Sequence, residues 1–250
     1  MKFFSGRGPS LSLRMTICYS IVDFFMTEKK YEPIIGLEIH AQISTKSKMF
    51  CRCGNDSFGA EPNINTCEIC MGFPGTLPVI NQDAVQKALI AALALNCRIP
   101  AFSRFDRKNY FYPDLPKGYQ ISQYDQPLAV SGSLPLPDGR RIGITRLHME
   151  DDAGKLTHVA QGTLCDYNRS GTPLMEIVSE PEIHSGEEAV HYAKEIQKIL
   201  RYTGSSDADM EKGMMRFDIN VSVREVGAKA FGTKVEVKNL NSFRSLERAI

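Results

Sequence analysis

One histidine and six acidic residues of this 250-residue sequence have the types that bind a divalent cation. They come from four separate segments: Glu38, His40, Glu150, Asp151, Asp152, Asp218 and Glu236. Carboxylates that lie close together repel each other unless a hard cation neutralises them. If the fold brings these segments together, we expect Mg²⁺ that bridges phosphate oxygens. If it does not, each acid is an ordinary solvated residue.

Four basic residues lie near these acids in the sequence, and their positive charge could neutralise the phosphates of a nucleotide. They are Arg146, Lys155, Lys234 and Lys238. A P-loop is absent, because Met149 stands in place of its first glycine and Leu156 in place of its Ser or Thr. The sequence also lacks a G-x-S-x-G nucleophile elbow. A Walker phosphate cradle is therefore excluded.

Four of the seven cysteines, Cys51, Cys53, Cys67 and Cys70, fall within twenty residues. The spacing C-x-C, thirteen residues, C-x-x-C places two thiol pairs on either side of a polar loop, as a tetrahedral zinc site needs. Buried thiols or disulfides are the alternative. Four thiolates leave no open position for a substrate, so we expect a structural zinc in an insertion over residues 49–72.

The candidate site residues must be positioned by strands, and four segments alternate apolar and polar residues with period two: 35–43, 142–152, 217–224 and 233–238. In the last of them, Val235 and Val237 are expected to face the core. Parity puts Asp151 on the opposite face from Glu150, so a bulge or strand end must intervene if both serve one site. The polar faces carry most of the candidates: Glu38, His40, Arg146, His148, Glu150, Asp152, Asp218 and Glu236.

Helices are expected on the other face of such a sheet. Asn81 or Asp83 can cap a helix that runs to about Leu95 and is apolar all round, so we expect it to be buried. The capping box Ser185-x-x-Glu188 opens a second helix that ends at Gly204, and a third begins after residue 242. An antiparallel sheet with helices packed on one face is an α+β fold.

The run from Arg107 to Gln123 is rich in tyrosine and is twice interrupted by proline. Such a segment is a poor strand and a good loop that lines a site or a channel.

The composition is that of a globular protein, with 30 basic against 29 acidic residues and 42% hydrophobic residues. No apolar stretch is long enough to span a membrane, and any contact with nucleic acid must be local. Residues 1–25 have three interpretations. A secretory signal is disfavoured because no small-residue cleavage site follows the apolar run, an organellar transit peptide fits, and we favour an upstream start with the true start at Met26. Because the sequence stops within a predicted helix, we expect the domain over residues 26–250 to be incomplete at its C-terminus.

From about Tyr31 onward, the chain resembles the N-terminal catalytic portion of the B subunits of the aspartyl/glutamyl-tRNA amidotransferases, the GatB/GatE family. The resemblance rests on long motifs in the same order: Ile35-Gly-Leu-Glu-Ile-His40, Lys108-Asn-Tyr-Phe-Tyr-Pro-Asp114, Arg146-Leu-His-Met-Glu-Asp-Asp-Ala-Gly-Lys155, Asn168-Arg-Ser-Gly-Thr-Pro-Leu174, Glu176-Ile-Val-Ser-Glu-Pro181 and Lys238-Asn-Leu-Asn-Ser242. It implies a cytoplasmic ligase, or one of an organellar matrix if residues 1–25 are a transit peptide. The fold would be similar to the sheet of glutamine synthetase and guanido kinases.

The resemblance also implies a reaction. ATP phosphorylates the side-chain carboxylate of glutamate or aspartate misacylated onto tRNA(Gln) or tRNA(Asn), and ammonia from a separate amidase subunit then displaces the phosphate. A small third subunit completes the complex. The Mg²⁺ site is implied at Glu38, His40, Glu150, Asp151 and Glu236, with Asp218 as a further ligand, and the first four are the catalytic candidates. The tyrosine-rich loop would line the ammonia route, with Lys108, Tyr110, Tyr112 and Asp114 as candidates.

Two alternatives remain from the residues themselves. A zinc-stabilised, non-catalytic interaction module predicts bound zinc but no ATP turnover. A metal-dependent phosphohydrolase predicts ATP hydrolysis that does not require aminoacyl-tRNA.

Overall fold

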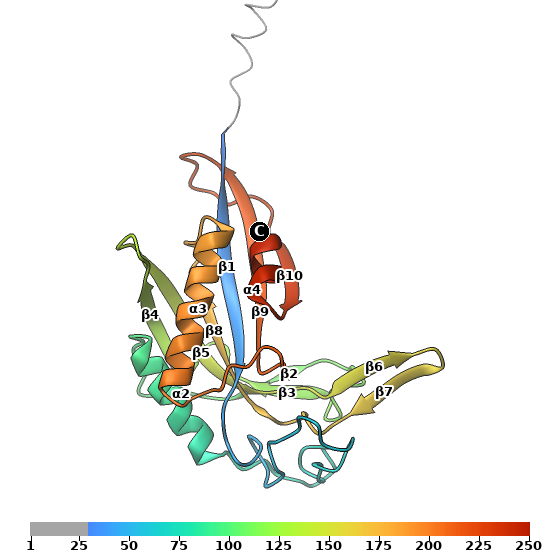
Figure 1. Cartoon of the computed structure of the whole chain (residues 1–250). Coiled ribbons are helices and arrows are strands. Elements are labelled where there is room, and N and C mark those ends of the chain that lie inside the picture. The colour runs from blue at the N-terminus through green and yellow to red at the C-terminus, as the bar shows by residue number, and fades with distance from the viewer. Residues whose placement is uncertain (1–29) are drawn as a thin grey trace, which may run out of the picture.

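A six-stranded antiparallel sheet forms the centre of the computed structural model, which describes residues 30–250 (Figure 1). The strand order is β10-β9-β1-β8-β5-β4. The interpretations of residues 1–25 lie outside the described residues. The strands are β1 (Tyr31–Gln42), β4 (Ala129–Pro135), β5 (Arg141–Asp151), β8 (Pro173–Ser179), β9 (Met215–Glu225) and β10 (Val235–Leu240).

All four predicted strands are present, as β1, β5, β9 and β10. The sequence analysis did not identify β8, although it lies between β1 and β5 at the centre of the sheet. Its residues P-L-M-E-I-V-S are almost all buried, so no alternation marks it as a strand. Its one charged side chain is Glu176.

Within residues 30–250, three helices pack on one face of the sheet: α2 (Gln82–Ala94), α3 (Gly186–Tyr202) and α4 (Phe243–Arg248). Figure 1 shows α3 lying along the sheet in front of β1 and β8. The predicted caps are confirmed, since Asn81 accepts from the backbone N–H groups of Asp83 and Ala84, and Ser185 accepts from that of Glu188. The shared core contains residues of β1, β5, β8, β9 and α3: Ile35, Leu37, Ile39, Leu147, Ile177, Phe217, Tyr192, Ala193 and Ile196.

Two predictions about burial are wrong. Helix α2 is not buried all round, because only one face meets the core; Ile90 and Leu93 are 47% and 62% exposed. Val235 does not face the core but is 57% exposed. It lies on the last strand of the sheet, and the neighbouring Val223 on β9 is also exposed, so the core does not extend to this corner.

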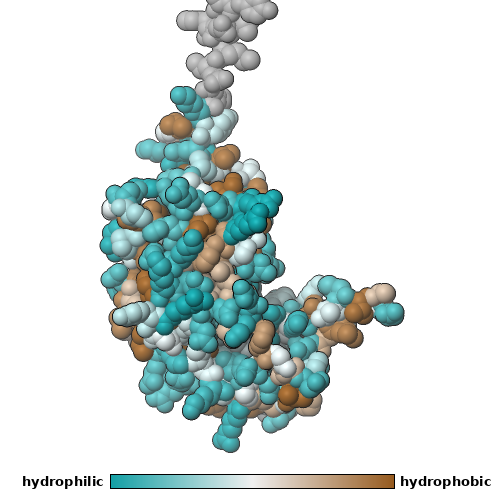
Figure 2. Space-filling model, viewed as in Figure 1, coloured by the Kyte–Doolittle hydropathy of each residue, from teal (hydrophilic) through white to brown (hydrophobic). Residues whose placement is uncertain are grey.

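Two small strand pairs flank the large sheet: β2 (Asp106–Asn109) with β3 (Tyr119–Ser122), and β6 (Lys155–Val159) with β7 (Gly162–Asp166). The prediction of one continuous loop over residues 107–123 is therefore wrong at both ends. Both prolines lie between the paired segments, so they do not interrupt the β2–β3 ladder. Figure 2 shows the β6–β7 arm standing out from the body, with a hollow beside it.

None of the helices in the described part of the chain is long and apolar enough to cross a membrane.

Candidate functional site

A row of four directly opposed residues crosses the sheet on the face that the helices leave open. Arg216 of β9 lies opposite His40 of β1, His40 opposite Glu176 of β8, and Glu176 opposite His148 of β5. Directly opposed residues of antiparallel strands point to the same face, and their side chains interact. The neighbouring apolar residues, such as Ile39 and Ile177, point the other way into the core.

His40 lies at the centre of a buried group of carboxylates. Its Nδ1 lies 3.6 Å from Oε1 of Glu150 and 3.7 Å from Oε2 of Glu176, while its Nε2 lies 3.6 Å from Oδ2 of Asp218. The second imidazole, His148, places its Nε2 3.3 Å from Oε2 of Glu176. All five side chains are about one-tenth exposed or less. The site is thus a network of alternating imidazoles and carboxylates.

The network keeps its members charged despite their burial. Burial by itself lowers the pKa of His40, but the nearby carboxylates of Asp218 and Glu150 outweigh it and raise the pKa to about 9. Burial opposes ionisation of Glu150 as well, and there the two imidazoles, His148 and His40, hold the pKa of the carboxyl well below its ordinary value. The same balance lowers the pKa of Asp218.

Glu38 lies beside this group, and its Oε1 accepts a 2.8 Å hydrogen bond from Nδ2 of Asn220. Ligating atoms of Glu38, His40 and Asp218 lie within 4.8 Å of one another, and so do those of His40, Glu150 and Glu176. Nδ1 of His40 and Oδ1 of Asn220 are buried without a hydrogen-bond partner among the described residues. These separations and unpartnered atoms fit a divalent cation held mainly by oxygen.

Two predicted ligands do not join the group. Strand β5 continues regularly through Asp151, whose side chain forms an ion pair with Lys117 and accepts a 2.8 Å hydrogen bond from the N–H of Ile121. No bulge turns it toward Glu150. Glu236 of β10 lies opposite Asn220 of β9, further from His40 on the open face of the sheet. Its Oε1 lies 3.3 Å from Nζ of Lys238.

The predicted phosphate-binding residues are dispersed. Nε of Arg146 lies 3.3 Å from Nδ1 of His148, so this guanidinium is beside the network. In contrast, Lys155 begins the protruding β6 strand, Lys234 is exposed just before β10, and Lys238 pairs with Glu236. The structure therefore brings only one of the four to the acids.

Sequence reasoning missed Glu176 and Arg216. Both are central to the row, yet neither belongs to a cluster of charged residues in the sequence. A single glutamate within an apolar run is a signal that could have identified Glu176, because a charge buried on both sides needs partners. Arg216 directly precedes the apolar face of a predicted strand and carried no comparable signal.

The loop over residues 110–118 approaches the network at Tyr110. Burial and the nearby carboxylates of Asp114 and Glu150 raise the pKa of the Tyr110 hydroxyl to about 12. Tyr112 and Lys108 are exposed, and Asp114 buries one carboxylate oxygen that has no partner among the described residues. The loop is attached to the segment after β7, since the hydroxyl of Tyr167 donates to the carbonyl of Pro113.

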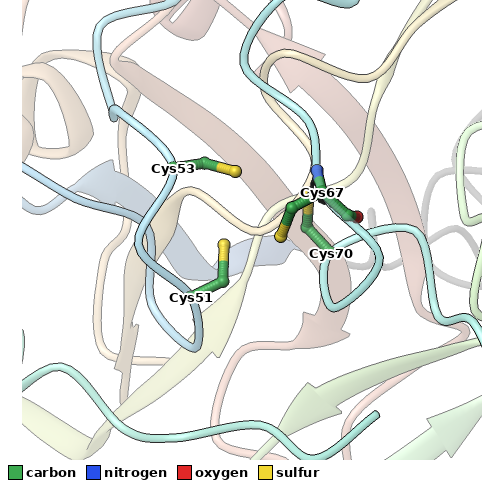
Figure 3. A group of neighbouring side chains, drawn as sticks. All are labelled: Cys51, Cys53, Cys67 and Cys70. Atoms are coloured by element: carbon green, nitrogen blue, oxygen red, sulfur yellow. Dashed lines mark hydrogen bonds between the residues drawn. The ribbon is translucent and has the colours of Figure 1, made fainter. Parts of the chain in front are cut away.

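The four predicted zinc ligands meet at one point. Figure 3 shows Cys51 and Cys53 on one loop, with their sulfur atoms directed toward Cys67 and Cys70 on another. The four sulfur atoms lie within 4.8 Å of one another, and the cysteines are free thiols. Chiefly through a hydrogen bond from Cys51, the pKa of Cys70 is lowered to about 4. These are the separations and charges of a four-cysteine metal site.

The cysteine loops are attached to the segment that enters β8. Nζ of the fully buried Lys48 donates to the carbonyls of Asn65 and Tyr167 and lies 3.7 Å from Sγ of Cys70. The side-chain amide of Asn168 joins the same segments, because it accepts from the N–H of Asn65. The insertion therefore supports the segment that leads into β8 and to Glu176.

The chain is similar in sequence to a known protein family. A family model described as the GatB/GatE catalytic domain matches residues 33–250. The chain is similar to proteins named as the B subunit of aspartyl/glutamyl-tRNA(Asn/Gln) amidotransferase: it is 56% identical to that of Synechococcus sp. strain JA-2-3B'a(2-13) over 232 residues, and 57% identical to that of Moorella thermoacetica over 228 residues. A third relative, from Persephonella marina, is 56% identical over 224 residues. Each match covers 88% of this chain but only 47% or 48% of the relative, so the chain spans about half the length of these proteins.

Proposed function

The chain belongs to the GatB/GatE catalytic domain family, and from this premise we propose that its open sheet face is the phosphorylation site of a tRNA-dependent amidotransferase. In the proposed reaction, ATP phosphorylates the side-chain carboxylate of glutamate on tRNA(Gln) or aspartate on tRNA(Asn). Ammonia then attacks the acyl phosphate, and inorganic phosphate leaves as the amide forms. The substrates are those named in the relatives' description.

The order of these steps has a chemical reason. A carboxylate is a poor electrophile because its charge is delocalised and its oxygen is a poor leaving group. Transfer of a phosphoryl group to one oxygen removes both obstacles without a covalent protein intermediate. The protein must therefore orient two anions, ATP and the carboxylate, and neutralise their charge.

The single observation that supports this function best is the buried imidazole and carboxylate network around His40. We assign the Mg²⁺ ligands to Glu38, His40 and Asp218, with Glu150 and Glu176 next to them. When bound there, Mg²⁺ would neutralise phosphate oxygens and favour phosphoryl transfer. Asn220 orients Glu38 by a hydrogen bond, so that the carboxylate is held in place before a ligand arrives. Asp151 and Glu236, which the resemblance also implies as ligands, are outside this group.

We further propose that the four-cysteine insertion binds structural zinc, and that the amidase subunit of the complex delivers ammonia past the loop over residues 110–118. The carboxylates of Asp114 and Glu150 act on the Tyr110 hydroxyl, Tyr112 and Asp114 lie along the same loop, and Lys108 lies on β2 just before it. A sheltered route keeps ammonia unprotonated and therefore nucleophilic. The small third subunit, a cytoplasmic or organellar location and a fold relationship to glutamine synthetase and guanido kinases belong to the same proposal.

ADP formation by the full-length protein, assembled with the amidase and the small subunit, tests the function. We expect turnover that requires misacylated tRNA and falls by at least about 100-fold in Glu38→Gln and in His40→Ala. Glu32→Gln is the matched control, because Glu32 lies on the same strand and face but pairs with Arg224 outside the network.

The alternatives predict other results. Turnover that is indifferent to tRNA would indicate a metal-dependent phosphohydrolase. A zinc-loaded protein without any turnover would indicate an interaction module. Equal activity in the Glu38→Gln and Glu32→Gln variants would contradict the assignment of the site.

A further inference from the structure

We propose that Arg216 binds the γ-phosphate of ATP, in a position that the predicted phosphate-binding lysines do not occupy. This inference rests on the proposed function and adds a residue to it. Arg216 lies directly opposite His40 in the pairing of β9 with β1, so the guanidinium and the imidazole share the open face of the sheet. Of the three predicted lysines, Lys155 lies on the arm, while Lys234 and Lys238 lie at β10.

An ion pair holds the guanidinium of Arg216 in place but leaves most of its N–H donors without an acceptor among residues 30–250. Its Nη2 lies 3.6 Å from Oδ1 of Asp152, a carboxylate that is only 3% exposed. An arginine offers five N–H donors, and within the described residues this ion pair engages only one nitrogen of Arg216. The side chain as a whole is 25% exposed, which leaves the other donors accessible from the open face.

Asp152 provides the anchor for this arrangement. It lies between two guanidinium groups, since Nε of Arg169 is 3.5 Å from its other oxygen. Arg169 itself donates to the carbonyls of Ala153 and Gly154, so its guanidinium donors are engaged within the protein. Arg216 is thus the member of the pair with donors left for a ligand.

The position of Arg216 suits a transferring phosphoryl group. During phosphoryl transfer, negative charge is spread over three equatorial oxygens, and a planar fork of donors is the geometry that matches two of them. The acids around His40 repel these oxygens, and a cation on the same face reduces that repulsion. Because Arg216 adjoins the proposed metal ligands, it is expected to contact the terminal phosphate rather than the adenosine.

Nucleotide binding measured by calorimetry, with Mg²⁺ and the complete assembled protein, tests this assignment. In Arg216→Met we expect about 10–100-fold weaker binding of a non-hydrolysable ATP analogue, and a change of less than about threefold for ADP, which lacks the γ-phosphate. In Arg216→Lys the loss of affinity for the ATP analogue should be smaller than in Arg216→Met. Lysine keeps the positive charge but lacks the planar pair of donors. The matched control is Arg224→Met, since Arg224 lies on the same strand and face, is 26% exposed and pairs with one carboxylate, Glu32.

Two other results for Arg216→Met overturn the inference. Equal losses for ATP analogue and ADP would place Arg216 at another phosphate, and unchanged nucleotide binding with a raised KM for aminoacyl-tRNA would place it at the substrate carboxylate. If the unaltered protein binds the ATP analogue in neither the presence nor the absence of Mg²⁺, the proposed function fails together with this inference. If binding is normal but ADP formation does not require tRNA, only the proposed function fails.

Loss of folding would not obscure the result. Removal of Arg216 alone leaves Asp152 with one cationic neighbour, so a second variant, Arg216→Met with Asp152→Asn, removes both charges. We expect this double variant to fold and to show the same selective loss for the ATP analogue. Retention of tight ATP-analogue binding by the folded double variant would overturn the inference.

Discussion

At the residue scale, His40 connects the two groups that could hold a cation. One of its ring nitrogens faces Glu150 and Glu176, and the other faces Asp218. Without a metal, a proton on His40 compensates these acids, because the attraction of their carboxylates outweighs its burial and raises its pKa to about 9. The imidazolium therefore contributes to the stability of the cation-free protein.

The pH dependence of stability follows from this shift. An unfolded histidine has a pKa of about 6.5, so the stabilisation is fully present below that pH and is lost as the pH rises through about 9. Without divalent cations, we expect the free energy of unfolding to fall by roughly 2–3 kcal/mol more in the unaltered protein than in His40→Gln between pH 6 and pH 10. Urea unfolding followed by circular dichroism measures this difference. Parallel profiles for the two proteins would contradict the assignment of the shift.

At the element scale, α3 covers the centre of the sheet with a continuous apolar stripe, as its sequence periodicity predicted. The stripe includes Tyr192, which is fully buried, and its hydroxyl has no hydrogen-bond partner among the described residues. A buried polar group without a partner reduces stability. The hydroxyl of Tyr192 therefore adds nothing to the packing of the helix and lowers the stability of the protein.

Removal of this hydroxyl is expected to stabilise the protein. In Tyr192→Phe we expect the free energy of unfolding to rise by about 1 kcal/mol, because the aromatic packing is kept and an unpaired donor is lost. Chemical denaturation measures the change. Tyr202→Phe on the same helix is the control, since Tyr202 is 97% exposed and should have no effect. A loss of stability in Tyr192→Phe would mean that the hydroxyl has a partner in solution.

The N-cap of α2 has a second role in joining elements. Oδ1 of Asn81 accepts from two backbone N–H groups of the helix, and its Nδ2 donates to the carbonyl of Ser47 at 3.0 Å. In Asn81→Ala we expect the free energy of unfolding to fall by about 2 kcal/mol. The substitution removes both the helix cap and the hydrogen bond to the segment before the cysteines. Thermal unfolding should show no comparable loss in Gln82→Ala, the exposed neighbour. Equal effects of the two substitutions would disprove the capping role.

At the scale of the whole molecule, the cysteine insertion and the sheet depend on each other through a few contacts. Residues 43–81 contain no helix and none of the paired strands of the sheets, and they are held to residues 166–171 by side-chain hydrogen bonds such as those of Lys48 and Asn168. Segments with little regular structure need another source of order. We attribute that role to a metal on the four cysteines.

Removal of the metal is therefore expected to loosen the insertion and leave the sheet intact. In Cys67→Ser with Cys70→Ser, we expect loss of bound zinc and tryptic cleavage between residues 49 and 81, with little change in circular dichroism. Zinc content and mass spectrometry of the fragments provide the measurement. Cys165→Ser is the control, because Cys165 lies on β7 outside the cluster. No zinc in the reduced, unaltered protein would leave the thiols with a purely packing role.

Local patterns predicted the amphipathic elements and missed the buried ones. Strands β1, β5 and β9 and helix α3 each have one apolar face, so their periodicity was sufficient. The cap at Asn81 located α2, although the prediction that this helix is buried all round was wrong. Strand β8 is buried on both faces and shows no period, and β2 and β3 are only four residues long. Such segments become strands because adjacent strands form hydrogen bonds with their backbone. A pattern within the segment itself does not predict those bonds.

The sequence by itself determined which chemistry is available: the spacing of four cysteines, the alternation that puts Glu38 and His40 on one face, and the parity that separates Asp151 from Glu150. These are consequences of local geometry, since side chains alternate along any strand. Only the tertiary structure decided which acids meet. Strand order and register brought Glu176 and Arg216 beside His40 and left Lys155 on the arm, because these positions depend on hydrogen bonds between segments that lie far apart in the chain.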